Sequence, residues 1–223
     1  MHMIGEQVNK DRAWQLFATT DKDASVQSWG TIVGDLNNDG NDDFITAKGN
    51  AAAHIDTPYL PVGNVNFGAL QIANGRFEPT LFSQFPTLKR SSRGIASADF
   101  DNDGKLDYVV NNNNGVLSLY MNHTDTNNNW ISFNCQPINL CNLVEFTLNT
   151  ESNKQLATKT LVKPQPFLSS NQRRVHFGLG QFDSDVSLKV TGPDNKYIFE
   201  KLALNHVYQL NLVQGEIDNI SKK

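Results

Sequence analysis

The sequence lacks the patterns that mark membrane proteins, nucleic-acid-binding proteins and the common enzyme classes. No apolar run approaches the roughly 20 residues that cross a bilayer. Basic residues form only isolated pairs, Lys89-Arg90 and Arg173-Arg174, so no basic face for nucleic acid is indicated. A nucleophile elbow, a zinc-protease helix motif, a phosphate loop and a dinucleotide fingerprint are all missing. We therefore expect no membrane span, no nucleic-acid partner and no enzymatic activity.

Cysteine is scarce, since the chain has only Cys135 and Cys141. With no further cysteine and no closely spaced histidines, a zinc site is not indicated. The pair bounds the segment CQPINLC between two strand-like stretches. Two interpretations stay open. One is a disulfide that closes this short loop, which suits an exported protein, and the other is a pair of buried thiols.

Helical periodicity is also hard to find, whereas short alternating runs bounded by Asn, Gly, Asp and Pro recur. A hydrophobic content of 39% is enough for a packed core in a chain of 223 residues. The sequence therefore predicts a mainly β fold. In the first half the predicted strands are Trp14–Ala18, Val26–Gly34, Asp43–Ala47, Phe67–Ala73, Arg76–Phe82, Gly94–Ala98, Asp107–Asn111 and Val116–Asn122.

What the sequence does have is aspartate and asparagine at a fixed spacing. The segment ADFDNDGKLDYVV (Ala98–Val110) contains four aspartates within nine residues, and GDLNNDGNDDFIT (Gly34–Thr46) repeats their spacing. Both segments read Asp-x-Asp/Asn-x-Asp-Gly-x-x-Asp and run into a strand-like tail. Two such strings in the same register indicate a duplicated unit.

A loop of this pattern can surround calcium, a hard cation that takes roughly 6 to 8 oxygen ligands. Positions 1, 3, 5 and 9 offer side chains, position 7 offers its backbone carbonyl, and glycine at position 6 permits a sharp turn. We therefore predict two bound Ca²⁺ ions. The predicted ligands are Asp35, Asn37, Asp39, Asn41 and Asp43 in the first loop and Asp99, Asp101, Asp103, Lys105 and Asp107 in the second.

EF-hands, metal-free turns and magnesium sites fit the two loops less well. An EF-hand carries glutamate at position 12 between two helices, but Thr46 and Val110 stand there and the flanks are strand-like. Metal-free hairpin turns remain an alternative, although a turn requires one or two such residues rather than four acids in register. Magnesium demands a tight octahedron and keeps its waters. Calcium also accounts for the acidity, because two ions would bring the formal charge of −4 to zero.

One repeat unit has the length and pattern of a four-stranded propeller blade, with a hairpin predicted at Asn74-Gly75. Within it, residues 51–65 are irregular and rich in strand-breaking residues. Long loops on rigid β scaffolds often carry binding residues, and His54, Asp56 and Tyr59 are the candidates here. The alternative is a surface connection without a partner.

The composition changes near residues 127–129, where the aspartate loops cease. We expect residues 1–126 to form about two calcium-binding, propeller-like blades, residues 127–215 a small β-sandwich or barrel with about seven strands, and residues 216–223 a tail.

His176 lies on an apolar strand pattern, which favours a hydrogen-bonded structural histidine over a catalytic one. Trp130 also lies in a strand pattern, which favours core packing over stacking on a sugar.

Two resemblances extend this picture. The Asp loops with their preceding Gly-containing strands, SWGTIVGDLNNDGNDDFIT and SRGIASADFDNDGKLDYVV, resemble FG-GAP/VCBS repeats, the calcium-loop blades of integrin-type β-propellers. The segment SSNQRRVHFGLGQFDSDVSLKV (Ser169–Val190) resembles the ASPIC/UnbV domain. Their order is similar to that of the cartilage acidic protein family and its bacterial relatives. A closed propeller has typically 4 to 8 blades, so two blades imply a fragment or a reduced form.

These observations together predict a non-catalytic calcium-binding interaction or adhesion protein. Because millimolar calcium is found mainly outside cells, we expect it to be extracellular, cell-surface or periplasmic. The calcium ions would stabilise loops that present a surface to a protein or glycan partner. Two alternatives stay open: a secreted enzyme or bacterial effector that uses residues 51–65, and a structural module of a larger secreted protein.

Overall fold

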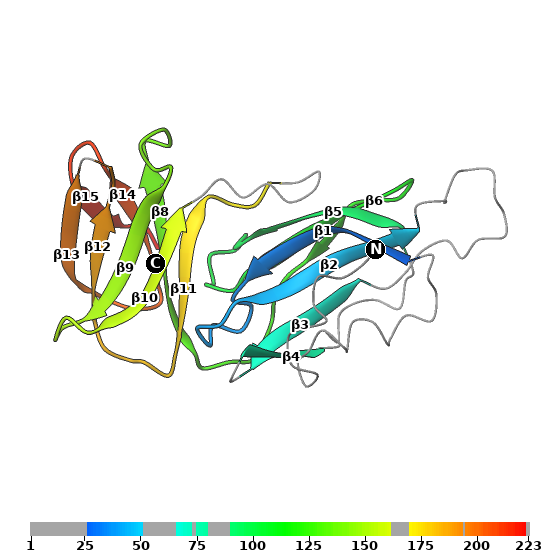
Figure 1. The fold of residues 1–223 in the computed structure, drawn as a ribbon, viewed down its shortest axis with the longest axis horizontal. Coiled ribbons are helices and arrows are strands. Elements are labelled where there is room, and N and C mark those ends of the chain that lie inside the picture. The colour runs from blue at the N-terminus through cyan, green and yellow to red at the C-terminus, as the bar shows by residue number, and fades with distance from the viewer. Residues whose placement is uncertain are drawn as a thin grey trace, which may run out of the picture.

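The computed structural model describes residues 26–50, 66–72, 75–79, 90–161, 170–193 and 195–221. Within these ranges the chain is almost entirely β, with its strands in four sheets (Figure 1). The mainly β fold predicted from the sequence is confirmed. The strands are β1 (Val26–Gly34), β2 (Asp43–Asn50), β3 (Phe67–Ile72), β4 (Arg76–Pro79), β5 (Ser92–Ala98), β6 (Asp107–Asn112), β7 (Ser118–Tyr120), β8 (Asn129–Gln136), β9 (Val144–Thr150), β10 (Gln155–Leu161), β11 (Arg174–Gly180), β12 (Val186–Thr191), β13 (Lys196–Leu202), β14 (His206–Asn211) and β15 (Glu216–Asn219).

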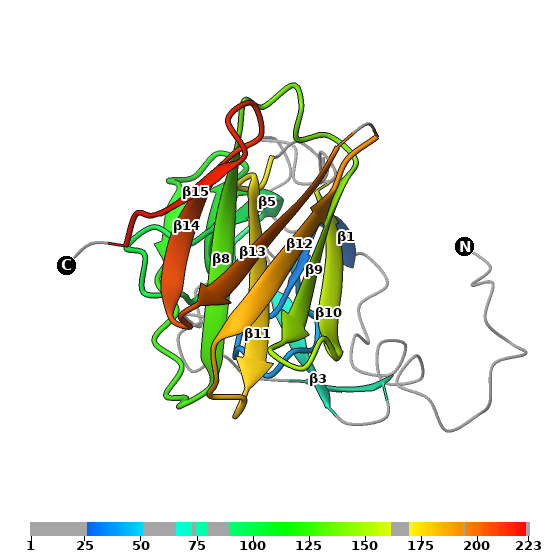
Figure 2. The ribbon, with the colours of Figure 1, turned by 90° about the vertical axis from the view of Figure 1, so that its left-hand side faces the viewer.

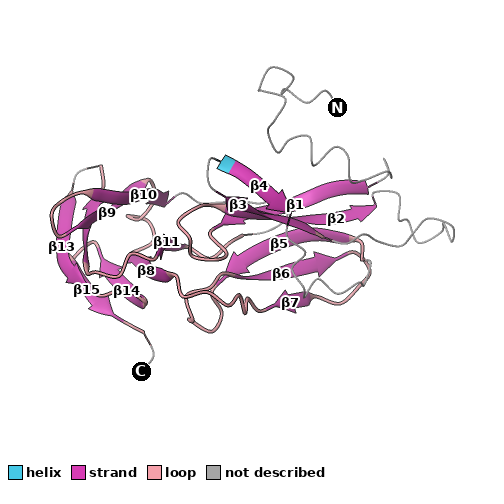
Figure 3. Ribbon diagram, turned by 90° about the horizontal axis from the view of Figure 1, so that it is seen from below, coloured by secondary structure: helices cyan, strands magenta, loops and turns pink. Residues whose placement is uncertain are grey.

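The first seven strands form two antiparallel sheets in chain order, β1-β2-β3-β4 and β5-β6-β7 (Figure 3). Each Asp-rich segment joins the first two strands of its sheet. Because side chains alternate along a strand, one face of each sheet can be apolar. Ile32 and Ile45 from one sheet pack with Ile95 and Val110 from the other, and none of these four is more than 2% exposed. The two sheets therefore share one core.

Two glycines bring the backbones of these sheets into contact. A Cβ on Gly30 would lie 2.9 Å from the carbonyl oxygen of Arg93, and one on Gly49 would lie 2.6 Å from that of Ser92. Both distances are shorter than real Cβ contacts, so a side chain at either position would push β1 and β2 away from β5. The Arg93 guanidinium carbon lies over the Trp29 ring, 4.4 Å from the ring centroid, beside the contact that Gly30 makes.

The remaining strands form a β-sandwich of two four-stranded sheets, β10-β9-β12-β13 and β11-β8-β14-β15 (Figure 2). Neither sheet closes into a barrel, which decides between the two predicted alternatives. Phe133 and Phe177 from one sheet meet Phe146 and Leu188 from the other in the core, and each is at most 1% exposed. The β8–β14 pair is parallel, whereas the other pairs of the sandwich are antiparallel.

Some predicted boundaries differ from those observed. Glu216–Asn219, assigned to a tail, instead form β15 against β14. Strand β7 is only three residues long, because Asn112 Nδ2 donates to the Val116 carbonyl and the Asn122 amide donates to Asp107. The predicted strand Trp14–Ala18 lies outside the described residues. Within the ranges described, no helix is both long and apolar enough to cross a membrane.

Candidate metal centre

The first Asp-rich loop connects β1 to β2 and is organised by its own carboxylates. Asp35 and Asp43, at its two ends, are 1% and 0% exposed. The Gly40 amide donates to Asp35 Oδ2 at 2.8 Å. Asp43 accepts two backbone amides, from Leu36 at Oδ2 (2.8 Å) and from Gln71 of β3 at Oδ1 (2.8 Å). The last carboxylate of the loop therefore ties it to the third strand of its sheet.

The second loop, between β5 and β6, repeats these bonds position by position. The Gly104 amide donates to Asp99 Oδ2 at 3.2 Å. Asp107 accepts the Phe100 amide at Oδ2 (2.8 Å) and the Asn122 amide, just after β7, at Oδ1 (2.7 Å). The duplicated sequence pattern thus corresponds to a duplicated pattern of hydrogen bonds.

The backbone angles of the two loops agree as well. At position 4, Asn38 and Asn102 have φ angles of 59° and 60°. At position 6, Gly40 and Gly104 have φ angles of 91° and 85°. Glycine adopts this region readily and asparagine tolerates the left-handed helical part of it, which explains these residue types at these positions. Both loops are consequently held in one shape by local bonds and backbone preference.

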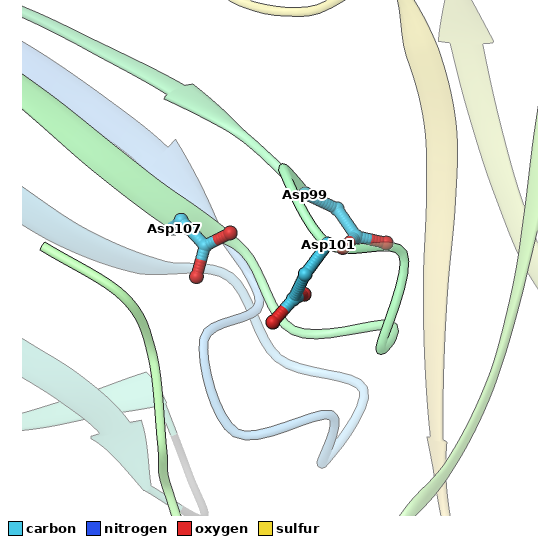
Figure 4. Close-up of side chains that lie close together, drawn as sticks. All are labelled: Asp99, Asp101 and Asp107. Carbon is cyan, nitrogen blue, oxygen red and sulfur yellow. The ribbon is translucent and has the colours of Figure 1, made fainter. Parts of the chain in front are cut away.

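Three carboxylates of the second loop converge. One oxygen each from Asp99, Asp101 and Asp107, at positions 1, 3 and 9, lie within 4.8 Å of one another (Figure 4). Asp103, the predicted ligand at position 5, does not belong to this cluster. It accepts the Lys105 amide at 2.8 Å, and the Lys105 ammonium lies 3.8 Å from its other oxygen.

The first loop arranges its side chains in a related way. Asn37 Oδ1 accepts the Asp39 amide at 3.1 Å, as Asp101 does from the Asp103 amide at 3.2 Å. Asp39 accepts both the amide and the side chain of Asn41, at 2.8 and 3.0 Å. Asn37 Nδ2 donates to the second Asp39 oxygen at 3.2 Å. The side chain of Asn37, at position 3, therefore donates a hydrogen bond to Asp39. The second loop has Asp101 at this position, which has no side-chain nitrogen to donate.

Burial raises the pKa of the carboxyl groups at both ends of each loop. The pKa of Asp35 is raised to about 6 and that of Asp43 to about 7, chiefly by desolvation. Desolvation likewise raises the pKa of Asp99 to about 6 and that of Asp107 above its ordinary value. Neighbouring aspartates add to each shift, backbone amides oppose it, and at Asp99 the Arg174 charge opposes it more than the amide does. Without a cation these carboxyl groups hold protons more readily than an exposed aspartate does.

One oxygen at the converging carboxylates has no partner. Asp99 Oδ2 accepts the Gly104 amide and lies 3.2 Å from Arg174 Nη1, whereas Asp99 Oδ1 is buried without any hydrogen-bond partner. A buried unpaired acceptor is costly, so such a group calls for a ligand. An oxygen-rich, anionic donor set with an unfilled acceptor suits a hard divalent cation. The residues present therefore fit calcium.

The sandwich contributes an arginine that the sequence did not reveal as part of this site. Besides Asp99, the Arg174 guanidinium donates to Asn102 Oδ1 at 2.9 Å and to Asn134 Oδ1 at 3.1 Å. Its side chain is 9% exposed and that of Asp99 is 1% exposed, so the ion pair is buried. Nothing local in the sequence around Arg174 indicates which acid it faces.

His176 joins the sandwich to both loops through Asn38. Asn38 Nδ2 donates to the Gly104 carbonyl at 3.0 Å, so Asn38 Oδ1 is the acceptor for His176 Nε2 at 2.7 Å. The other ring nitrogen, Nδ1, then accepts from the Ser132 hydroxyl at 2.7 Å. Burial lowers the pKa of His176 to about 3, which keeps the ring neutral. It is a hydrogen-bonded structural histidine, as the sequence predicted.

Close packing completes the joint between the two halves. The ring of Trp130 lies directly against Gly104, and Gly178 lies directly against Asp35 and Asn38, so that a Cβ at either glycine would overlap these neighbours. The Gly180 amide also donates to the Asn38 carbonyl at 2.8 Å. A cleft of about 380 Å³ between the halves is lined by the first aspartate of each loop, Asp35 and Asp99. Both candidate sites thus adjoin one cleft.

The other candidate positions have separate outcomes. His54, Asp56 and Tyr59 lie outside the described residues, so the predicted binding role of residues 51–65 stays a prediction. Cys135 and Cys141 are joined by a disulfide with an S–S distance of 2.07 Å, which is the first of the two interpretations considered. The bridge closes the loop that follows β8 in the sandwich.

Comparison with known proteins bears on the second half of the chain. No curated protein matches the sequence. The resemblance of the first half to FG-GAP/VCBS repeats stays a prediction. The ASPIC and UnbV family matches residues 144–217, which cover strands β9 to β14 and the beginning of β15. The second half of this chain therefore contains an ASPIC/UnbV domain.

Proposed function

We propose that this protein is a non-catalytic calcium-binding interaction module. Its calcium ions hold the loops 35–43 and 99–107 in shape against the ASPIC/UnbV domain. The observation that carries this proposal is the buried, unpartnered Oδ1 of Asp99, a residue whose carboxyl group clusters with those of Asp101 and Asp107. The duplicated hydrogen bonds of the first loop support a second site at the corresponding positions there.

The proposed ligands follow from the two loop structures. Asp99, Asp101 and Asp107 hold one ion, and their counterparts Asp35, Asn37 and Asp43 hold the other. The carbonyls of Lys105 and Asn41 complete the sets in this proposal, with Asp103 and Asp39 as further oxygen donors. When bound, each ion supplies positive charge to carboxylates whose burial otherwise favours protonation.

The two sheets of the first half support an assignment to FG-GAP/VCBS-type blades. In each sheet the Asp loop connects the first two strands, as the repeat resemblance implies. The disulfide between Cys135 and Cys141 supports an oxidising compartment, and weak calcium sites are filled outside cells. We therefore propose a secreted, cell-surface or periplasmic protein that presents its calcium-held surface to a protein or glycan partner.

Thermal unfolding with and without calcium tests the proposal. The melting temperature and protease resistance of the purified protein are measured in EDTA and in millimolar CaCl₂. We expect both to rise with calcium in the wild type and the rise to shrink in Asp99→Asn. The matched control is Asp183→Asn, an exposed aspartate of the sandwich, which should respond like the wild type. If the melting temperature and protease resistance of the wild type are the same in EDTA and in calcium, a structural role for calcium is contradicted.

A further inference from the structure

A second cleft lies in the sandwich beside the disulfide loop, away from the loops described above. It has a volume of about 630 Å³, within the range of small-molecule sites. Its walls come from the end of β8, the segment before β11 and the turn after β14. The side chains used in the argument below are those of Arg173, Gln136, Gln209, Ile138 and Val213.

Arg173 is the one charged residue among the described residues that line this cleft. Its Nη2 donates to Asn142 Oδ1 at 2.6 Å, but its Nε is buried and has no hydrogen-bond partner. Within the described part of the chain, no ion pair involves Arg173. The Arg173 charge therefore has no carboxylate partner among the described residues, and a ligand carboxylate is an acceptor that fits the planar fork of a guanidinium. The cleft therefore favours one negative charge.

The other walls favour hydroxyl groups and an aliphatic face. Gln136 and Gln209 offer side-chain amides, which both donate and accept as hydroxyl groups do. Gln209 Nε2 makes only long contacts, at 3.5 Å to the Asn134 carbonyl and 3.4 Å to the Leu210 carbonyl. Ile138 and Val213 are 57% and 70% exposed and give the cleft its apolar surface.

We propose that this cleft binds a carboxylate-bearing saccharide, such as a uronic or sialic acid residue. Arg173 pairs with the carboxylate, the amides bond the hydroxyl groups, and Ile138 and Val213 contact the C–H face of the ring. A single guanidinium matches one carboxylate charge better than the two charges of a phosphate monoester. The inference rests on the proposed interaction function in that it names a glycan as the partner, but it uses none of the calcium loops.

Titration by ¹H–¹⁵N NMR tests this assignment on the calcium-loaded protein. The probes are glucuronate, galacturonate and N-acetylneuraminate, each beside its methyl ester, which keeps the ring and hydroxyl groups but removes the charge. At least one acid should shift the amides of residues 134–138 and 209–214 more strongly than its ester does. Arg173→Gln should weaken that binding about tenfold, with Arg173→Lys between the two. Arg76→Gln, at an exposed arginine of β4 that pairs with Glu78, is the control and should bind like the wild type.

Several results would overturn the assignment. Absence of binding by all three acids, equal binding of acid and ester, or binding unaffected by Arg173→Gln each contradicts it. A carboxylate-terminated glycine peptide that binds as well as the sugar acids would show that the site does not select saccharides. Calcium titration of the same samples by calorimetry reports separately on the proposed function. Failure to bind sugar acids with calcium binding intact therefore rejects only this inference.

Discussion

The two Asp-rich loops share a backbone conformation but differ in what surrounds their first aspartate. Asp99 in the second loop faces the buried Arg174 guanidinium at 3.2 Å, whereas both oxygens of Asp35 accept backbone amides of their own loop, from Gly40 and Asp39. The first loop also carries Asn37 where the second has Asp101. Local sequence therefore sets the loop shape, while the ASPIC/UnbV domain makes the two charge environments unequal.

The largest expected difference between the loops comes from the arginine. Arg174→Gln leaves Asp99 buried without its cation and should lower the free energy of unfolding in EDTA by about 3 to 5 kcal/mol. The comparison variant, Lys159→Gln, removes a more exposed ion pair with Asp42 at the first loop and should cost less than about 1 kcal/mol. Urea unfolding measures both. Equal losses of unfolding free energy in the two variants would show that contact with the sandwich does not make the two loops differ.

The two position-6 glycines should also differ. Alanine at either position is strained at its positive φ, by roughly 1 to 2 kcal/mol. At Gly104 the added methyl group overlaps the Trp130 ring, whereas at Gly40 the nearest atom is 3.5 Å away. Overpacking adds about 1 to 3 kcal/mol, so Gly104→Ala should be the more destabilising by that amount. Similar melting temperatures for the two variants would place Trp130 elsewhere in solution.

The pH dependence of the metal-free protein follows from the raised pKa values. Asp35 and Asp43 have folded pKa values of about 6 and 7, above the ordinary 3.8, so the folded state binds more protons. Their contribution is fully present below about pH 4 and is lost as pH rises through 6 to 7. The loss is about 1.4 kcal/mol for each pH unit that separates the ordinary pKa from the folded pKa.

Urea unfolding in EDTA from pH 4 to 8 measures this loss. The lowered pKa of His176 makes stability rise with pH over the same range, so the quantity to compare is the difference between the wild type and the double variant Asp35→Asn/Asp43→Asn. The wild type should lose stability relative to this variant from pH 4 to 7, and saturating calcium should stabilise the wild type most at pH 7 to 8. A wild type that gains stability relative to the double variant from pH 4 to 7 would contradict the raised pKa values of Asp35 and Asp43.

The smallest expected difference concerns the asparagines at position 4. Asn38→Gly keeps the left-handed backbone but removes the acceptor for His176 and the donor to Gly104, and should cost about 1 to 3 kcal/mol. Asn102→Gly removes one of several acceptors for Arg174 and should cost less than about 1 kcal/mol. Circular dichroism melts compare the two. A lower melting temperature for Asn102→Gly than for Asn38→Gly would contradict the view that the contacts of Asn38 contribute more to stability than those of Asn102.

Local pattern was enough to predict the shape-determining features of the fold. Strand β1 has the predicted bounds, and the spacing around Asp99 and Asp107 predicted a loop in which the structure brings three carboxylates, those of Asp99, Asp101 and Asp107, close together. These features depend on residues close together in the sequence, where glycine, asparagine and alternation restrict the backbone. Short and polar strand β15 was missed because Glu216, Asp218 and Asn219 give it no apolar alternation.

The joint between the halves could not be predicted in the same way. Asn38 and His176 are 138 positions apart, and Arg174 and Asp99 are 75 apart. No periodicity within a segment indicates which distant partner will satisfy a buried polar group. Tertiary contacts decide these cases.

Calorimetric titration of the metal-free protein with CaCl₂ tests the central claim most directly. The account predicts two calcium ions per chain, with affinities as weak as the millimolar range of extracellular sites, and loss of the second-loop ion in Asp99→Asn. Absence of binding up to tens of millimolar calcium, or unchanged stoichiometry in Asp99→Asn, would contradict it.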